Sequence, residues 1–208
     1  YRLDNEFNKY FKNYDFHNLY KELLNFCTVD LSSFYFDIRK DTLYCDPIDS
    51  KKRKSSLILL NIILNSLLKW FAPILSFTTE EIYQLVSKKN KSIHLEKFLK
   101  YPKKFENNEL EDKWTQLLKI RDICNLSIEQ KRAEKIIGSS LEASLKITLD
   151  KKNFSLVKSV DLAELCITSS VNVDESNNDE IFVETTKANG VKCPVCWKIN
   201  LEKCPRHD

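Results

Sequence analysis

The 208 residues are 42% hydrophobic and 11% aromatic, so the chain can bury a real core and is long enough for a main domain and a smaller one. Only two glycines and five prolines are present, which leaves few places for the tight turns of barrels and favours helices. A formal net charge of only +3 gives no indication of a general polyanion-binding protein.

The cysteines indicate the compartment. There are seven of them, an odd number, and no signal peptide precedes them. A disulfide framework is therefore not expected, and a reducing cytoplasm is. The chain begins at Tyr1 and contains no methionine, so we expect a fragment of a longer polypeptide that acts as one module.

We expect residues 1–108 to form a helical bundle. Asp15 is a suitable N-cap for a helix whose apolar stripe lies within residues 16–27. Asp30 then precedes a second stripe within residues 31–38. These patterns repeat at helical spacing, which favours an all-α start to the chain.

Residues 57–71, LILLNIILNSLLKWF, are the most apolar stretch of the chain. Asn61, Asn65 and Lys69 recur every four residues as one narrow polar stripe, and the apolar surface extends well beyond one face. We therefore predict a helix buried inside the bundle, with neighbours on several sides. A membrane span is disfavoured, because polar residues interrupt the run and Pro73 ends it short of about 18 apolar residues. We predict no membrane association.

Helices continue beyond this stretch. Thr78 and Glu81 have the spacing of a capping box, which predicts that a second helix starts there. Residues 88–105 form a basic connector with interleaved aromatic residues. A long amphipathic helix is expected over residues 109–135, with Gly138 as its C-cap.

The pattern then changes to a period of two. Apolar and polar residues alternate over residues 145–150, and residues 166–173 and 181–186 are also strand-like. Residues 109–190 are therefore predicted to hold the long helix and a small α+β subdomain. The predicted fold is mainly α, with a helical bundle, a small α+β unit and a terminal knuckle over residues 191–208.

The terminal knuckle carries the metal chemistry. Two closely spaced pairs, C-P-V-C and C-P-R-H, each span one tight turn and offer two ligands to one metal. We predict one structural Zn²⁺ with no open coordination position, because all four ligands come from the protein. The alternatives are a disulfide, free thiols or a redox pair. The predicted ligands are Cys193, Cys196, Cys204 and His207.

Basic residues and a tryptophan surround the predicted metal site. An aromatic ring can stack on an unpaired RNA base, and neighbouring cations can bind its phosphates, so this combination is typical of RNA binding. Trp197 directly follows the second cysteine, and it could equally pack over the zinc site as core. A second basic cluster, residues 51–54, lies on the N-terminal side of the apolar helix, where the macrodipole disfavours positive charge; an anionic partner would explain it.

A family resemblance is carried by four ordered blocks. NFCTVDLSSFYFDIRKDTLYCD and LKWFAPILSFTTEEIYQL, followed by KIIGSSLEASLKI and NGVKCPVCW, resemble the C-terminal half of bacterial-type class I isoleucyl-tRNA synthetases. The resemblance covers residues 10–207. It implies an anticodon-binding helical bundle, a small α+β appendage and a zinc knuckle that together help to hold the anticodon arm of tRNA(Ile). This family usually completes the site with a second C-x-x-C, whereas here the fourth position is His207.

The resemblance also implies which activity belongs elsewhere. The whole enzyme would ligate isoleucine to tRNA(Ile) using ATP, but neither the HIGH-like nor the KMSKS-like motif of the class occurs here. We predict no catalytic residues and an inactive, monomeric fragment that meets ATP and isoleucine only through a missing catalytic domain. The predicted RNA-binding residues are Trp197, Arg206, Lys192, Lys198, Arg39, Lys40, Lys51, Lys52, Arg53 and Lys54.

Two other functions are compatible with the residues. One is a DNA-binding zinc-finger module, although no helix-two-turn-helix or catalytic N-terminal proline accompanies the finger. The other is a zinc-containing helical scaffold for protein interactions, which the low net charge keeps open. Binding to tRNA(Ile), an unrelated tRNA and duplex DNA would separate the three.

Overall fold

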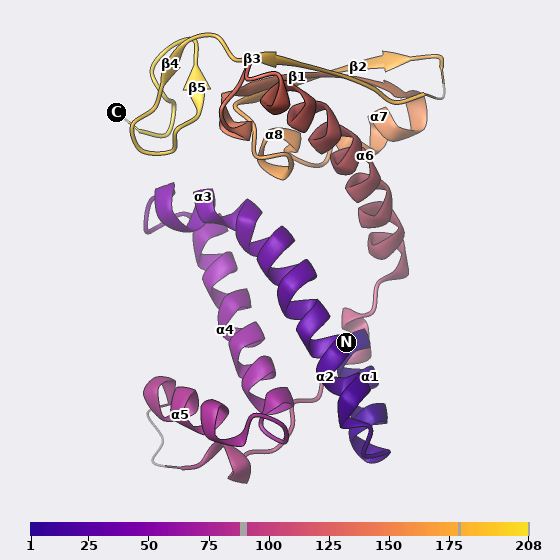
Figure 1. The fold of residues 1–208 in the computed structure, drawn as a ribbon, viewed down its shortest axis with the longest axis vertical. Coiled ribbons are helices and arrows are strands. Elements are labelled where there is room, and N and C mark those ends of the chain that lie inside the picture. Colours follow the sequence, from indigo (N-terminus) through magenta and orange to yellow (C-terminus); the bar gives the residue numbers. More distant parts are fainter. Residues whose placement is uncertain (88–90, 179, 208) are drawn as a thin grey trace. The chain divides into compact units, whose positions relative to one another are not determined.

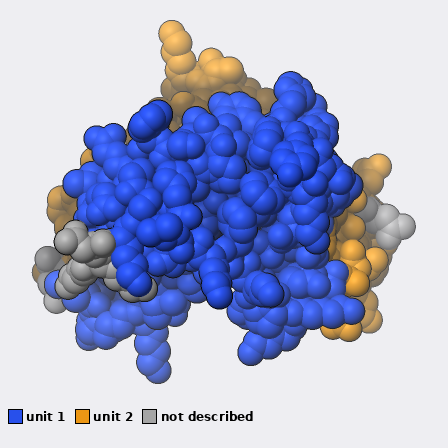
Figure 2. Space-filling view, turned by 90° about the horizontal axis from the view of Figure 1, so that it is seen from below, with its two compact units in different colours: residues 1–106 blue, residues 107–208 orange. Residues whose placement is uncertain are grey.

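The computed structural model describes residues 1–87, 91–178 and 180–207, so residues 88–90 of the basic connector lie outside the described residues. The chain forms two compact units, Tyr1–Glu106 and Asn107–Asp208 (Figure 2). The predicted fold class, mainly α with a small α+β unit and a terminal cysteine cluster, is confirmed. The three-part division at residues 108 and 190 stays a prediction.

Helices build the first unit (Figure 1). In chain order they are α1 (Arg2–Lys12), α2 (Phe16–Asn25), the π-helix η1 (Phe26–Phe36), α3 (Asp37–Cys45), α4 (Lys51–Phe71) and α5 (Ser76–Val86). Two short 3₁₀ turns, η2 (Ile93–Leu95) and η3 (Lys103–Phe105), follow α5.

The stretch from α2 to α3 is one continuous helical run. Asp15 begins it, accepting a hydrogen bond from the Asn18 amide at 3.2 Å, and this confirms the predicted N-cap. The chain does not break at Asp30, which lies inside η1. Ser33 Oγ donates to the Thr28 carbonyl, five residues earlier, at 2.9 Å, which matches the wider turn of a π-helix.

The core of unit 1 gathers at the C-terminal half of α4. Trp70 packs with Phe7, Leu19 and Leu23 of α1 and α2, and its indole nitrogen donates to the buried Asp4 carboxylate at 3.3 Å. A second cluster joins α4 to α5 and η2 and contains Leu68, Ala72, Tyr83 and Ile93. Residues from three helices and the connector therefore fix the end of α4.

The first half of α4 is exposed, so the prediction of a helix buried on several sides is wrong there. Leu57, Ile58 and Ile62 expose 51%, 64% and 45% of their surface. Helices α2, α3 and α5 contact α4 in unit 1, and they leave these three side chains exposed. Burial depends on which helices pack alongside, and the apolar pattern does not specify them.

Helix α5 starts two residues before the predicted capping box. Its first residue is Ser76, and the preceding Leu75 provides no side-chain cap. Thr79 Oγ1 donates back to the Leu75 carbonyl at 2.9 Å. The turn after α4 feeds directly into α5, with the Leu75 amide bonded to the Phe71 carbonyl at 2.7 Å, so the prediction of a start at Thr78 is wrong.

Helix α6 (Asn108–Ala133) opens unit 2, and its C-terminal end also differs from the prediction. Lys135, with φ of 58°, adopts the left-handed conformation just past the helix, and the Ile136 amide bonds back to the Lys131 carbonyl at 3.0 Å. This is the geometry of a Schellman-type end. Gly138 lies further on and is not the C-cap.

A small sheet follows α6. Its strands are β1 (Ala143–Asp150), β2 (Ser170–Ser176) and β3 (Phe182–Lys187), in the order β2-β1-β3. Strand β1 pairs in parallel with β2 and antiparallel with β3. The 3₁₀ turn η4 (Ser140–Glu142) leads into β1, and the helices α7 (Lys151–Val157) and α8 (Leu162–Leu165) connect β1 to β2.

One face of this sheet forms the core of unit 2. Leu145, Ile147 and Leu149 are fully buried, which confirms the predicted period-two strand. Helices α6, α7 and α8 lie on that face (Figure 1). Ser127 of α6 hydrogen-bonds Thr185 of β3 at 2.7 Å. Among the helices of the described residues, none has the length and apolar character that a membrane span requires.

Candidate metal centre and basic surfaces

A two-stranded hairpin presents the first ligand pair. Strands β4 (Val191–Lys192) and β5 (Ile199–Asn200) flank a tight turn that is closed by the Cys193 amide bonding to the Lys198 carbonyl at 2.9 Å. The Trp197 amide also bonds to the Cys193 carbonyl at 3.0 Å, and Trp197 has a φ of 65°. This turn brings both cysteines of the C-x-x-C pair to one side.

Gly190, which no sequence motif singles out, adopts the backbone conformation that leads into the hairpin. Its φ is +127°, a conformation that residues with a side chain rarely adopt. A Cβ atom here would lie 2.0 Å from the carbonyl oxygen of Asn200. The chain has only two glycines, and the position of one of them directly before the knuckle is the sequence feature that indicates this role.

The rest of unit 2 anchors the hairpin through Ser169. The Ile199 amide donates to Ser169 Oγ at 2.7 Å, and Ser169 Oγ itself bonds to the Leu141 carbonyl. The segment just before β2 therefore stabilises the hairpin, in addition to the pairing of β4 with β5.

The four predicted ligands meet at one point. His207 Nδ1 lies 3.5 Å from Cys193 Sγ and 3.4 Å from Cys204 Sγ, and Cys196 Sγ lies 3.8 Å from Cys204 Sγ. All four ligand atoms lie within 4.8 Å of one another, and the group could hold a metal ion. Cys193 and Cys196 are buried, whereas Cys204 and His207 are half-buried.

The environment of the three thiols shifts their pKa values in different directions. A hydrogen bond from the Cys196 amide lowers the pKa of the Cys193 thiol to about 6. Burial raises the pKa of the Cys196 thiol to about 12. For Cys204, burial acts upward, but hydrogen bonds from the Arg206 amide and His207 outweigh it, and the pKa is lowered. Thiolate is the form that binds metals, so a cation would stabilise all three sulfurs.

Trp197 lies on the surface of the knuckle. Its side chain is 59% exposed, so it does not pack over the cysteines as core. The Lys192 ammonium sits 5.6 Å from the centre of the indole ring, a cation–π contact within the same hairpin. Lys198 and Arg206 are half-exposed nearby in the sequence. An accessible ring thus stands beside positive charge.

The other predicted basic residues lie in unit 1. Arg39 and Lys40 belong to α3: the Arg39 guanidinium lies 5.9 Å from the Tyr35 ring, and Lys40 pairs with Asp37 at 2.9 Å. Residues 51–54 form the first turn of α4, where Arg53 Nη1 donates to the Asp46 carbonyl at 2.7 Å. Helices α3 and α4 are in contact, so unit 1 brings both basic groups to one end of α4.

Comparison with known proteins identifies the family. A family model described as the anticodon-binding domain of tRNA ligase matches residues 1–148. An isoleucine–tRNA ligase of Pelagibacter ubique is 69% identical over 100% of this chain. Isoleucine–tRNA ligases of Agrobacterium fabrum and Caldicellulosiruptor saccharolyticus are 40% and 38% identical over 91% and 99% of it.

The match covers a part of each relative. The chain spans 23% of the length of the Pelagibacter protein, and 21% and 24% of the other two. The family model covers the whole helical unit and the start of the small sheet. The chain belongs to the family of anticodon-binding domains of tRNA ligases.

Proposed function

We propose that this chain binds the anticodon arm of tRNA(Ile) as part of an isoleucine–tRNA ligase. The observation that carries the proposal is the 69% identity to such a ligase over the whole chain, together with the anticodon-binding family match. Activation of isoleucine with ATP and its ligation to tRNA belong, in this proposal, to the portion of the relatives that the chain does not match. The chain itself binds and does not catalyse.

We further propose that the four-ligand group holds one structural Zn²⁺. Tetrahedral zinc with bonds of about 2.3 Å to sulfur and about 2.05 Å to nitrogen separates two sulfurs by about 3.8 Å and sulfur from nitrogen by about 3.5 Å. The distances of 3.8, 3.5 and 3.4 Å among the side chains agree with these values. Four protein ligands leave no open position, so the metal's role is to hold the knuckle together.

The RNA contacts are of two kinds in this proposal. Trp197 supplies an exposed ring on which an unpaired base of the anticodon loop stacks. Lysine and arginine side chains bind phosphates and make affinity depend on salt. The phosphate-binding residues are Lys192, Lys198 and Arg206 on the knuckle and Arg39, Lys40, Lys51, Lys52, Arg53 and Lys54 in unit 1.

Fluorescence anisotropy of labelled tRNA(Ile) tests the proposal, with an unrelated tRNA and a duplex DNA as competitors. We expect tRNA(Ile) to bind most tightly, with an affinity that falls steeply as salt rises. Preference for duplex DNA would support a DNA-binding zinc-finger module. Absence of binding to all three nucleic acids would favour a protein-interaction scaffold.

Two variants separate stacking from charge. Trp197→Ala should leave the salt dependence unchanged and reduce the preference for tRNA(Ile), at a cost of about 1–3 kcal/mol, and Trp197→Phe should restore part of it. Arg206→Ala should weaken binding to all tRNAs alike and reduce the salt slope by about 0.7 to 0.9. A Trp197→Ala protein that keeps its zinc and its full preference would show that the ring does not contact RNA.

Location and assembly complete the proposal. Among the described residues no disulfide joins the cysteines, and we propose that the chain works in a reducing cytoplasm. We also propose that the chain is a monomer. Light scattering of the purified chain tests this, and a dimeric mass would contradict it.

A further inference from the structure

A surface on which lysines and apolar side chains alternate lies in unit 1, in the connector that follows α5. We define the connector surface by five residues around an open hollow of about 740 Å³: Lys91, Leu95, Lys97, Phe98 and Lys100. None of these residues belongs to the RNA-binding set predicted from the sequence, although the connector is basic. The lysines and the apolar side chains therefore line the same hollow.

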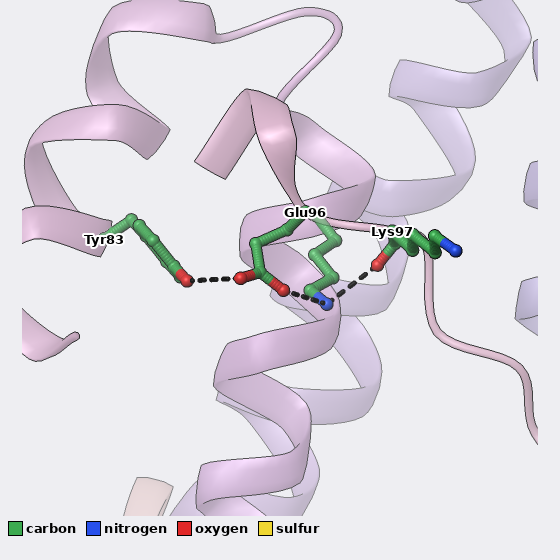
Figure 3. Close-up of polar contacts among 4 residues, drawn as sticks. Tyr83, Glu96 and Lys97 are labelled. Atoms are coloured by element: carbon green, nitrogen blue, oxygen red, sulfur yellow. Dashed lines mark hydrogen bonds and ion pairs between the residues drawn. The ribbon is translucent and has the colours of Figure 1, made fainter. Parts of the chain in front are cut away.

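Lys69 and Glu96 form the least exposed part of the lining, here called the floor of the hollow, and Figure 3 shows the polar contacts that hold them. Glu96 accepts a hydrogen bond from the Tyr83 hydroxyl at 3.1 Å and pairs with the Lys69 ammonium at 3.5 Å. The side chains of Lys69 and Glu96 are only 13% and 24% exposed. The Lys69 ammonium also donates to the Lys97 carbonyl at 2.8 Å. Helices α4 and α5 therefore hold the backbone of the connector at residues 96–97.

The start of the connector is held in the same way. Glu80 of α5 accepts hydrogen bonds from Ser92 Oγ at 2.8 Å and from the Ile93 amide at 2.9 Å. Ile93 itself is buried against α4 and α5. Because both ends of residues 92–97 are anchored, the side chains that project from this segment are presented by a fixed backbone.

The rim of the hollow is positively charged. Lys69 and Glu96 offset each other in the floor, so the charge comes from Lys91, Lys97 and Lys100, which are exposed. Figure 3 shows the Lys97 side chain extending away from the cluster that holds its carbonyl. Among the described residues that line the hollow, Glu96 is the only acid. Such a rim favours an anionic ligand.

Apolar surface lies between these lysines. The Phe98 ring packs at 5.0 Å from the Phe7 ring and 5.2 Å from the Phe11 ring, and 38% of its surface remains exposed. Leu95 is 79% exposed. A fixed aromatic ring among lysines suits an unstacked base flanked by its phosphates.

The connector surface is separate from the basic cluster at the start of α4. Lys54 and Lys69 are fifteen positions apart on that helix, which is about 22 Å along its axis. The two surfaces are at opposite ends of α4, so one small ligand cannot occupy both. An RNA strand is long enough to reach each of them.

We propose that the connector surface binds a single-stranded stretch of tRNA. Lys97 and Lys100 contact successive phosphates, and a base lies against Phe98 and Leu95. This inference rests on the proposed function, since it takes RNA as the partner of the chain. It adds a contact site that neither the knuckle nor the start of α4 provides.

The test compares two matched double variants of the whole chain. Lys97→Gln with Lys100→Gln removes two charges from the connector surface, and Lys151→Gln with Lys152→Gln removes two exposed charges from the start of α7. Affinity for a labelled tRNA(Ile) transcript is measured by anisotropy over a series of salt concentrations. For two single-strand phosphate contacts, the slope of log affinity against log salt concentration should become shallower by about 1.4. The connector variant should therefore bind about 25-fold more weakly than the unchanged chain at 0.1 M salt, and this difference should disappear near 1 M salt.

The α7 control pair should bind as the unchanged chain does. A third variant, Phe98→Leu, keeps an apolar contact with Phe7 and Phe11 but removes the ring, and should lose about 5-fold or more in affinity with no change of slope. Circular dichroism confirms that each variant is folded. A connector variant that binds like the control pair overturns the inference and leaves the proposed function intact. An unchanged chain that shows no preference for tRNA(Ile) overturns both.

Discussion

His207 should contribute less to zinc affinity than the buried Cys196. We compare His207→Ala with Cys196→Ala in the purified, zinc-loaded chain. Cys196 is buried, with 6% of its surface exposed, whereas His207 is half-buried. Water can replace an imidazole at an accessible position, but it replaces a buried thiolate poorly.

The magnitudes follow from the number of ligands. Structural zinc sites contribute roughly 10–16 kcal/mol of apparent binding free energy, so each of four ligands accounts for about 2.5–4 kcal/mol. At about 1.4 kcal/mol per factor of ten, Cys196→Ala should weaken zinc binding by about 100-fold or more. His207→Ala should weaken it by about tenfold, because a water molecule takes the vacated position.

Competition with a chromophoric chelator measures both affinities. Cys27→Ser is the matched control, since Cys27 lies in η1 and outside the ligand group; it should bind zinc as the unchanged chain does. If His207→Ala and Cys196→Ala lost equal zinc affinity, the burial of the two side chains would not determine how much each contributes. Protein that is purified without chelator and holds no zinc, with a Cys193–Cys196 disulfide in its place, would refute the site altogether.

Three further outcomes follow from the structure. Zinc affinity should fall as pH falls, because the Cys196 thiol, with a pKa of about 12, must release a proton when it binds zinc, and below about pH 6 the Cys193 thiol must release one as well. In chelator competition, the decline of zinc affinity with falling pH should therefore become steeper below about pH 6. An affinity that does not change with pH would contradict the assignment. Gly190→Ala should disrupt the hairpin and weaken zinc binding, since its Cβ would lie 2.0 Å from the Asn200 carbonyl oxygen; a variant with the zinc affinity of the unchanged chain would show that the backbone relaxes freely. Ile147→Ala, at a fully buried position of the central strand, should lower the free energy of unfolding by about 2–5 kcal/mol in a urea titration, and a loss under 1 kcal/mol would be inconsistent with its burial.

Features set by neighbours in sequence could be predicted without the structure. The alternation along β1 needs only the two-residue period of a strand, and Leu145, Ile147 and Leu149 are buried as expected. Asp15 caps α2 through a bond to a residue three positions on. The spacing within each Cys/His pair also needs only a tight turn, and the four side chains come together as expected, while metal binding itself stays a prediction.

Features that depend on distant partners could not be predicted. The apolar pattern of α4 does not say which sides meet another helix, and half of the helix remains exposed. Lys69 was recognised as part of a polar stripe, but its partner Glu96 is 27 residues further on and is reached only after α5 and the connector have folded back. The connector surface was missed for the same reason.

The measurement that tests the central claim most directly is binding of the unchanged chain to an isolated RNA stem–loop. The stem–loop carries the anticodon arm of tRNA(Ile), and its control has the same stem with a different anticodon. If the chain holds the anticodon arm, the cognate stem–loop should bind about tenfold or more tightly than the control, with a steep salt dependence in both cases. Equal affinity for the two stem–loops would contradict anticodon recognition, even if both bound well.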